Sequence, residues 1–255
     1  MKASLTLLEQ FFHGCDQSGW GYSEQQIATA EARLSVTFPK VLKEFYAMFG
    51  TCPYMNAGGN DPIPLGLEDF FIPDPSYNAP LYVPEELDFL VFSSITDVSA
   101  IDYGIRLSDL ALDDPPVYFC DYGDTSWELE NTSLLNFLVT TAFWQIAAGT
   151  GLDHKLTIYL GYHHPQVLPD LKCYITGLGM DSHELENLSD SYQHYRIFLR
   201  DDVLLALETE PWDPSEESPS EYFNWLTAVS TNREKILEIK KIPNLVWEEN
   251  AGGES

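Results

Sequence analysis

The chain has 255 residues, and its hydrophobic fraction of 44% is sufficient for the core of one large domain or two modest domains. Forty acidic residues against 13 basic residues give a formal net charge of −27. A surface of this charge repels nucleic acid and anionic lipid and attracts cationic partners, although it also serves plain solubility.

The acidity is spread along the sequence rather than gathered in a tail. Residues 1–150 hold 21 acids and five bases, and residues 151–255 hold 19 acids and eight bases. No apolar run has the length of a membrane span, and Glu9 interrupts the apolar residues near the N-terminus, so we expect neither a transmembrane helix nor a signal peptide. The four cysteines lack CxxC spacing, which favours free thiols in a reducing cytoplasm; they are Cys15, Cys52, Cys120 and Cys173.

A first helix is expected over residues 4–13, where apolar residues recur at helical spacing. Residues 23–50 then predict two short helices joined by a tight corner. Ser23 has the spacing of a capping box, and Pro39 suits the first turn of the second helix. Gly50 is expected to end that helix in the left-handed conformation. The second helix gives the pair a broad apolar face, so we expect the two helices to pack against a sheet.

Residues 51–87 predict an ordered loop, because seven prolines argue against regular structure while five aromatic residues argue against a free linker. Strands are expected after it, over residues 89–95, 101–107, 116–122 and 126–130. Residues 133–149 predict an amphipathic closing helix. This order indicates an α+β fold, in which the N-terminal helices and the closing helix cover an antiparallel or mixed sheet.

A pattern of residues in the helical pair and near the closing helix is similar to that of a known superfamily. It comprises Ile27, Glu31, Leu34, Phe38-Pro39, Leu42, Phe45 and Gly50, followed by Asp121, Trp127, Leu134, Phe137 and Leu138. With the strands between them, these residues resemble the SUKH superfamily over residues 20–148. The chain departs from the family at Phe49-Gly50, where the family more often has Asn-Gly, and in its long loop of residues 51–87.

The resemblance implies a function as well as a fold. The best-known bacterial members of the SUKH superfamily are immunity proteins of polymorphic toxin systems, and related members are regulatory proteins. The resemblance therefore implies a non-enzymatic protein that binds a cognate toxin domain, such as a basic nuclease, and blocks its cleft. The step from fold to immunity is an analogy with the family.

Residues 151–255 lie beyond the resemblance and predict a smaller α+β unit, either a separate domain or an extension of the first sheet. Strands are expected over residues 155–162, 171–178, 195–200, 203–208, 225–230 and 244–249, with a hairpin turn at Asp201-Asp202. A capping box of Thr231 and Glu234 predicts a helix. The expected divisions of the chain are residues 1–150, residues 151–250 and a disordered tail over residues 251–255.

Acidic residues next to aromatic residues form the predicted partner-binding surface. They lie in three stretches, residues 65–71, 112–114 and 121–131. The residues are Glu68, Asp69, Phe70, Asp113, Asp114, Asp121, Asp124, Trp127, Glu128 and Glu130. Aromatic anchors that fill a pocket, with carboxylates that pair with lysine and arginine, suit a basic protein surface. The alternative interpretation is solvated turns around a core tryptophan.

No catalytic or metal-binding motif is found in the sequence. The clustered histidines, which lack the spacing of a zinc site, are His163, His164, His183 and His194. Carboxylate pairs occur at Asp113-Asp114, Asp201-Asp202 and Asp121 with Asp124, and nothing in the sequence distinguishes one of them as a glycosidase pair. We therefore expect no metal and no cofactor.

Three hypotheses remain open from the sequence. The first is a cytoplasmic immunity protein that binds a basic toxin domain, and the second is a regulatory or scaffold protein whose acidic surface binds a cellular partner. The third is a carboxylate-dependent hydrolase, which requires a large pocket with two carboxyl groups about 5–10 Å apart. A shallow acidic face with exposed aromatic residues favours the first two. Neither nucleic acid nor a membrane is expected as a partner.

Overall fold

The computed structural model describes residues 4–55, 62–73, 88–95, 101–121, 126–148, 155–159, 194–200, 203–209, 224–239 and 248–249. The chain divides into two compact units, Gln17–Gln145 and a second unit made of Met1–Asp16 with Ile146–Ser255. Each unit has helices and an antiparallel sheet among its described residues, so the expected α+β class is confirmed. The domain boundary at residue 150 stays a prediction, and the predicted tail over residues 251–255 lies outside the described residues.

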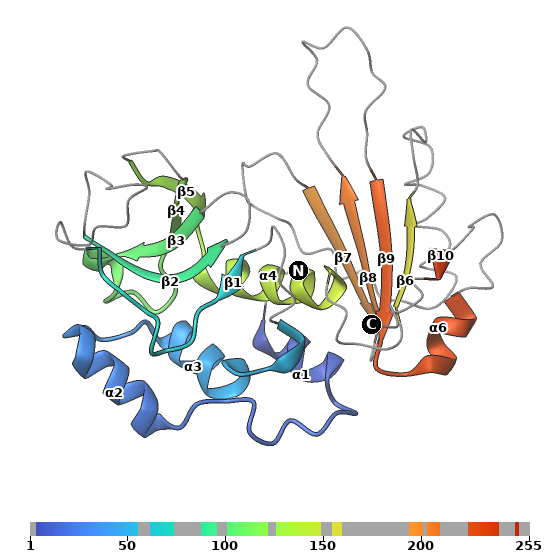
Figure 1. Cartoon of the computed structure of the whole chain (residues 1–255), viewed down its shortest axis with the longest axis horizontal. Helices are drawn as coiled ribbons and strands as arrows, with labels where there is room; N and C mark the ends of the chain where they lie inside the picture. Colours follow the sequence, from blue (N-terminus) through green and yellow to red (C-terminus); the bar gives the residue numbers. More distant parts are fainter. Residues whose placement is uncertain are drawn as a thin grey trace, which may run out of the picture. The chain divides into compact units, whose positions relative to one another are not determined.

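Helices α2 (Glu24–Leu34) and α3 (Lys40–Phe49) form the predicted pair (Figure 1). Ser23 caps α2 as expected, because its hydroxyl accepts a hydrogen bond from the amide of Gln26 and the Gln26 side chain accepts one from the amide of Ser23. The buried residues of both helices recur at helical spacing; they are Ile27, Ala30, Val41, Leu42, Phe45, Tyr46 and Phe49.

Gly50 ends α3, but the expectation that it would be left-handed is wrong. Its backbone is right-handed helical, with φ −60°, and a Cβ atom there would meet the ring of Tyr22 at 2.6 Å. Close packing rather than backbone conformation therefore requires glycine at this position. Ser35, the C-cap of α2, is left-handed instead, with φ 58°.

The sheet of this unit is an antiparallel meander (Figure 1). Its strand order among the described residues is β1-β2-β3-β4-β5. The strands are β1 (Ile63–Pro64), β2 (Phe89–Ile95), β3 (Ile101–Arg106), β4 (Val117–Asp121) and β5 (Glu128–Asn131). Strands β2 to β5 match the predicted strands to within two residues at each end. The sequence did not reveal β1, because a two-residue strand has no alternation to detect.

Every residue of β2 is buried, and the strand contributes to two apolar clusters. Phe92 packs against Phe137 of α4 (Leu134–Ala148), with ring centroids 5.8 Å apart. The carbonyl of Phe92 also accepts a hydrogen bond from the Tyr46 hydroxyl of α3 at 3.4 Å. The second cluster contains Phe89, Val91, Cys120 and Trp127. Helices α3 and α4 are thus both attached to the sheet at β2.

Helix α4 is not amphipathic as expected. Consecutive residues from Asn136 to Gln145, with the exception of Trp144, are buried. A helix that is buried at consecutive positions has no continuous solvent-facing side. Even so, neither α4 nor any other helix in the described part of the chain meets the length and apolarity that a membrane span requires.

The second unit contains α1 (Leu5–Phe11), which lies within the helix predicted over residues 4–13. Its described strands form an antiparallel sheet in the order β10-β6-β9-β8-β7. They are β6 (Lys155–Tyr159), β7 (His194–Arg200), β8 (Val203–Thr209), β9 (Asn224–Ser230) and β10 (Glu248–Glu249). Arg200 pairs with Val203, which confirms the predicted hairpin at Asp201-Asp202. The strand predicted over residues 171–178 lies outside the described residues.

Helix α6 (Arg233–Ile239) follows β9 as predicted, but its N-terminal cap differs from the prediction. The amide of Glu234 donates to Asn232 Oδ1 at 3.0 Å, so the capping residue is Asn232 rather than Thr231. The amide of Asn232 in turn donates to the Ser230 hydroxyl at 2.9 Å.

Candidate functional site

Glu68 and Asp69 lie on a short turn between β1 and β2, here called the acidic turn (residues 65–71). Both carboxylates are exposed, whereas the flanking residues Leu67 and Phe70 are buried. The amide of Asp69 donates to the carbonyl of Gly66 at 2.9 Å and closes the turn. The turn therefore presents two adjacent negative charges between two residues that are buried in the core.

Side chains from α2 and α3 hold the backbone of the acidic turn. The Arg33 Nη2 donates to the carbonyl of Leu67 at 2.8 Å and to the carbonyl of Phe70 at 2.9 Å. The Tyr46 hydroxyl donates to the carbonyl of Leu65 at 2.8 Å. Hydrogen bonds from a guanidinium are stronger than neutral ones, so Arg33 restricts the turn on both sides of its two acids.

Tyr22 adds a further contact to the acidic turn. Burial raises the pKa of Tyr22, and the negative charge of the hydrogen-bonded Glu68 raises this pKa further. The Glu68 carboxylate folds back over Gly66, where a Cβ atom would meet it at 2.9 Å. The Glu68 carboxylate thus lies beside Gly66 and Tyr22 while it remains exposed to solvent.

The two predicted aromatic anchors are core residues. Phe70 is fully buried, with its ring 5.5 Å from that of Phe38 and 5.1 Å from that of Tyr46. Trp127 is 8% exposed and stacks on Phe89 with ring centroids 4.3 Å apart. The prediction that these rings fill a partner's pocket is therefore wrong, because packing leaves neither ring a free face.

Asp113 and Asp114 act at the N-termini of two helices. The Asp114 carboxylate accepts hydrogen bonds from the Ser133 hydroxyl and the Leu135 amide, both at 2.8 Å, and so caps α4. Asp113 uses its main-chain carbonyl, which accepts from the amide of Val41 in α3 at 3.1 Å. The Asp113 carboxylate is exposed. Of these two acids, Asp114 caps a helix with its carboxylate, whereas Asp113 contacts a helix through its main-chain carbonyl.

The remaining predicted acids belong to the edge of the sheet. Glu128 is exposed on β5, and Asp121 is half-buried at the end of β4. Glu130 lies where the β4–β5 register shifts, and burial raises its pKa to about 7. Asp124 lies outside the described residues. Their role in binding a partner stays a prediction, as it does for Glu68, Asp69 and Asp113.

One apolar cluster connects two of the three predicted stretches. Leu65 and Phe71, at the two ends of the acidic turn, pack against the cluster that contains Trp127. Trp127 immediately precedes β5, so the acidic turn and the β5 edge share this support. The stretch with Asp113 and Asp114 is instead attached to α3 and α4.

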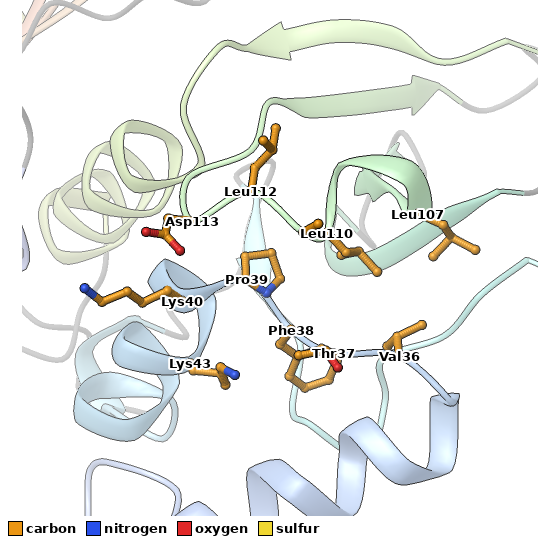
Figure 2. Close-up of a pocket in the computed structure, with 11 residues that line it drawn as sticks. Val36, Thr37, Phe38, Pro39, Lys40, Lys43, Leu107, Leu110, Leu112 and Asp113 are labelled. Carbon is orange, nitrogen blue, oxygen red and sulfur yellow. The ribbon is translucent and has the colours of Figure 1, made fainter.

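A groove that the sequence did not reveal lies between residues 36–43 and residues 107–113 (Figure 2). It encloses about 560 Å³ and is lined mainly by apolar side chains, with Lys40, Lys43 and Asp113 among the polar exceptions. Its two walls are about 70 positions apart in the sequence, so no local pattern could predict it. Leu112, a large apolar residue that lines this groove, is 51% exposed.

The described residues place some of the carboxylates, histidines and cysteines that the sequence offers as candidate catalytic or metal-binding groups. The groove is lined by a single carboxylate, Asp113, whereas a glycosidase requires a pair. No group of three metal-ligating side chains occurs among the described residues. His194 begins β7, and the other clustered histidines and the Asp201-Asp202 pair lie outside the described residues. The described cysteines, Cys15, Cys52 and Cys120, are free thiols.

Comparison of the chain with protein-family models, with curated proteins and with solved structures returned no match. The resemblance to the SUKH superfamily therefore stays a prediction that rests on the residue pattern.

Proposed function

We propose that this chain is a non-enzymatic protein-binding domain that uses exposed carboxylates to bind a basic surface of a partner protein. The observation that carries the proposal is the acidic turn, in which Arg33 and Tyr46 fix the backbone carbonyls while Glu68 and Asp69 stay exposed to solvent. Charges on a fixed backbone lose little conformational freedom when a partner binds, so more of the attraction contributes to affinity.

The net charge of the chain supports the same proposal. A charge of −27 accelerates the approach of a cationic protein and makes its association sensitive to salt. The SUKH resemblance makes a toxin domain, such as a basic nuclease, the first partner to test, with the complex formed in the cytoplasm and the cleft of the toxin blocked. A regulatory or scaffold role would use the same surface for a cellular partner.

Co-expression with the polypeptide encoded beside this chain tests the proposal. Size-exclusion chromatography at low and high salt should give a complex with one copy of each chain that weakens as salt increases. If the neighbour is toxic when expressed alone and harmless in the complex, immunity is established. A stable complex with a harmless neighbour would favour the regulatory role, and a chain that elutes alone at every salt concentration would contradict both.

A further inference from the structure

The groove between residues 36–43 and residues 107–113 has an apolar floor that is accessible from solvent. Figure 2 shows Leu107, Leu110 and Leu112 along one side and Val36 and Pro39 along the other. Its volume of about 560 Å³ falls within the roughly 300–1,000 Å³ range of ligand-binding sites. The groove can therefore accept apolar side chains from a bound segment.

The charges at the rim of the groove favour a basic occupant. Lys40 lies 3.7 Å from Glu44, and Lys43 lies 3.5 Å from Glu31, so each lysine is balanced by a glutamate of this chain. The Asp113 carboxylate is exposed at the same rim. When the two paired glutamates are counted with the lining, three acids stand against two lysines, and the surplus of one negative charge complements lysine or arginine beside an apolar anchor.

A ring contact connects the groove to the acidic turn. Phe38 lines the groove, and its ring lies 5.5 Å from the ring of Phe70. Phe70 directly follows Glu68 and Asp69 in the acidic turn. The floor of the groove and the acidic turn therefore share one buried packing contact.

We propose that the groove receives an apolar anchor, leucine or a larger residue, from a basic segment of the protein partner. This inference rests on the proposed function and specifies how the partner is recognised: charge attracts the basic segment, and the groove selects the apolar residue within it. Apolar anchors in desolvated pockets carry a large share of the binding energy in protein interfaces.

The test uses three synthetic hexapeptides and the full ¹⁵N-labelled chain. The peptides are Lys-Arg-Leu-Leu-Lys-Arg, the same peptide with serines in place of leucines, and Glu-Glu-Leu-Leu-Glu-Glu. In ¹H–¹⁵N titrations, the basic leucine peptide should saturably shift the amides of residues 107–112. The basic serine peptide should shift only amides near exposed acids. The acidic leucine peptide should shift neither these amides nor those of residues 107–112.

A matched pair of variants separates the groove from general apolar contact. Leu112→Ser removes an exposed leucine of the groove, and Leu129→Ser removes an exposed leucine of β5, at 51% and 49% exposure. Leu112→Ser should weaken binding of the basic leucine peptide roughly tenfold, whereas Leu129→Ser should leave it unchanged. Because each side chain is about half exposed, both variants should fold, and circular dichroism checks this.

The remaining outcomes separate this inference from the proposed function. If both basic peptides shift only the amides near exposed acids, the groove inference is wrong and the acidic surface stands. If no peptide binds, both the groove inference and the acidic binding surface are contradicted. Groove shifts with the acidic peptide would overturn the charge argument, and groove shifts on concentrating the chain without peptide would identify a second copy as the occupant.

Discussion

The Arg33 guanidinium donates a hydrogen bond of 2.9 Å to the main-chain carbonyl of Phe70. The same nitrogen also binds the carbonyl of Leu67, so the two bonds span Glu68 and Asp69. The chain has few basic residues, and Arg33 is used to fix backbone carbonyls beside a pair of exposed acids. This relationship gives the acidic turn a defined shape without removing its negative charge from solvent.

Arg33→Ala should therefore weaken partner binding even though it makes the chain more negative. Charge alone would predict tighter binding to a basic partner, whereas loss of the fixed turn predicts weaker binding. The two carbonyls are part-buried, so the free energy of unfolding should also fall by about 2 kcal/mol in urea titrations. Calorimetric titration at one salt concentration decides the question, and tighter binding would contradict the role of the turn.

Asp114 and Asp113 should respond differently to the same substitution. Asp114→Ala removes the carboxylate that caps α4 and should lower the free energy of unfolding by about 1–2 kcal/mol. Asp113→Ala keeps the main-chain carbonyl that binds Val41, so its effect should stay within about 0.5 kcal/mol. Urea unfolding of the two variants compares them directly, and equal losses would show that the cap is not the stabilising contact.

Trp127→Ala should destabilise the fold rather than act only on binding. The ring is buried and stacks on Phe89, so its removal should lower the free energy of unfolding by about 3–5 kcal/mol. Trp127→Phe keeps an aromatic ring in the cluster and should lower the free energy of unfolding by less. If Trp127→Ala unfolds like the native chain and loses only its partner, the assignment of Trp127 to the core would be wrong.

Glu130 should make stability depend on pH. Burial raises its folded-state pKa from 4.5 to about 7, so the folded state favours the neutral carboxyl. This contribution is fully present below about pH 4.5 and is lost as the pH rises to about 7. Glu130→Gln should therefore match the native chain near pH 4.5 and be more stable at pH 8, by on the order of 1 kcal/mol, because part of the side chain still meets solvent.

Urea unfolding of both proteins across this pH range measures the effect of Glu130. Glu128→Gln removes the same charge from an exposed position on the same strand and is the matched control. A difference between the native chain and Glu130→Gln that is the same at pH 4.5 and pH 8 would contradict the pKa shift.

Local sequence patterns predicted the elements but not their contacts. The apolar spacing of α2 and α3, the β-favouring composition of β2 and the alternate positions of β4 were sufficient, because these patterns lie within one element. The capping of α4 by Asp114 was not predictable, since the two partners are about 20 positions apart. Gly50 was misassigned for a related reason: its requirement comes from the ring of Tyr22, which no local rule includes.

The candidate site was only partly predictable. Exposed acids such as Glu68 and Asp69 could be found from charge and turn composition alone. Whether Phe70 faces solvent or the core depends on Phe38 and Tyr46, which lie in other elements. The groove beside Phe38 combines two distant segments, so it becomes visible only after the chain has folded.

The most direct test of the central claim is the affinity of charge-reversed variants for the co-purified partner. Glu68→Lys combined with Asp69→Lys alters the acidic turn, and Glu9→Lys combined with Glu234→Lys changes the net charge equally at exposed positions on α1 and α6. Isothermal titration calorimetry should show that the first variant loses at least roughly tenfold in affinity while the control loses much less. Equal losses in both variants would mean that net charge alone attracts the partner, and unchanged affinity in the first would contradict the acidic turn as a binding site.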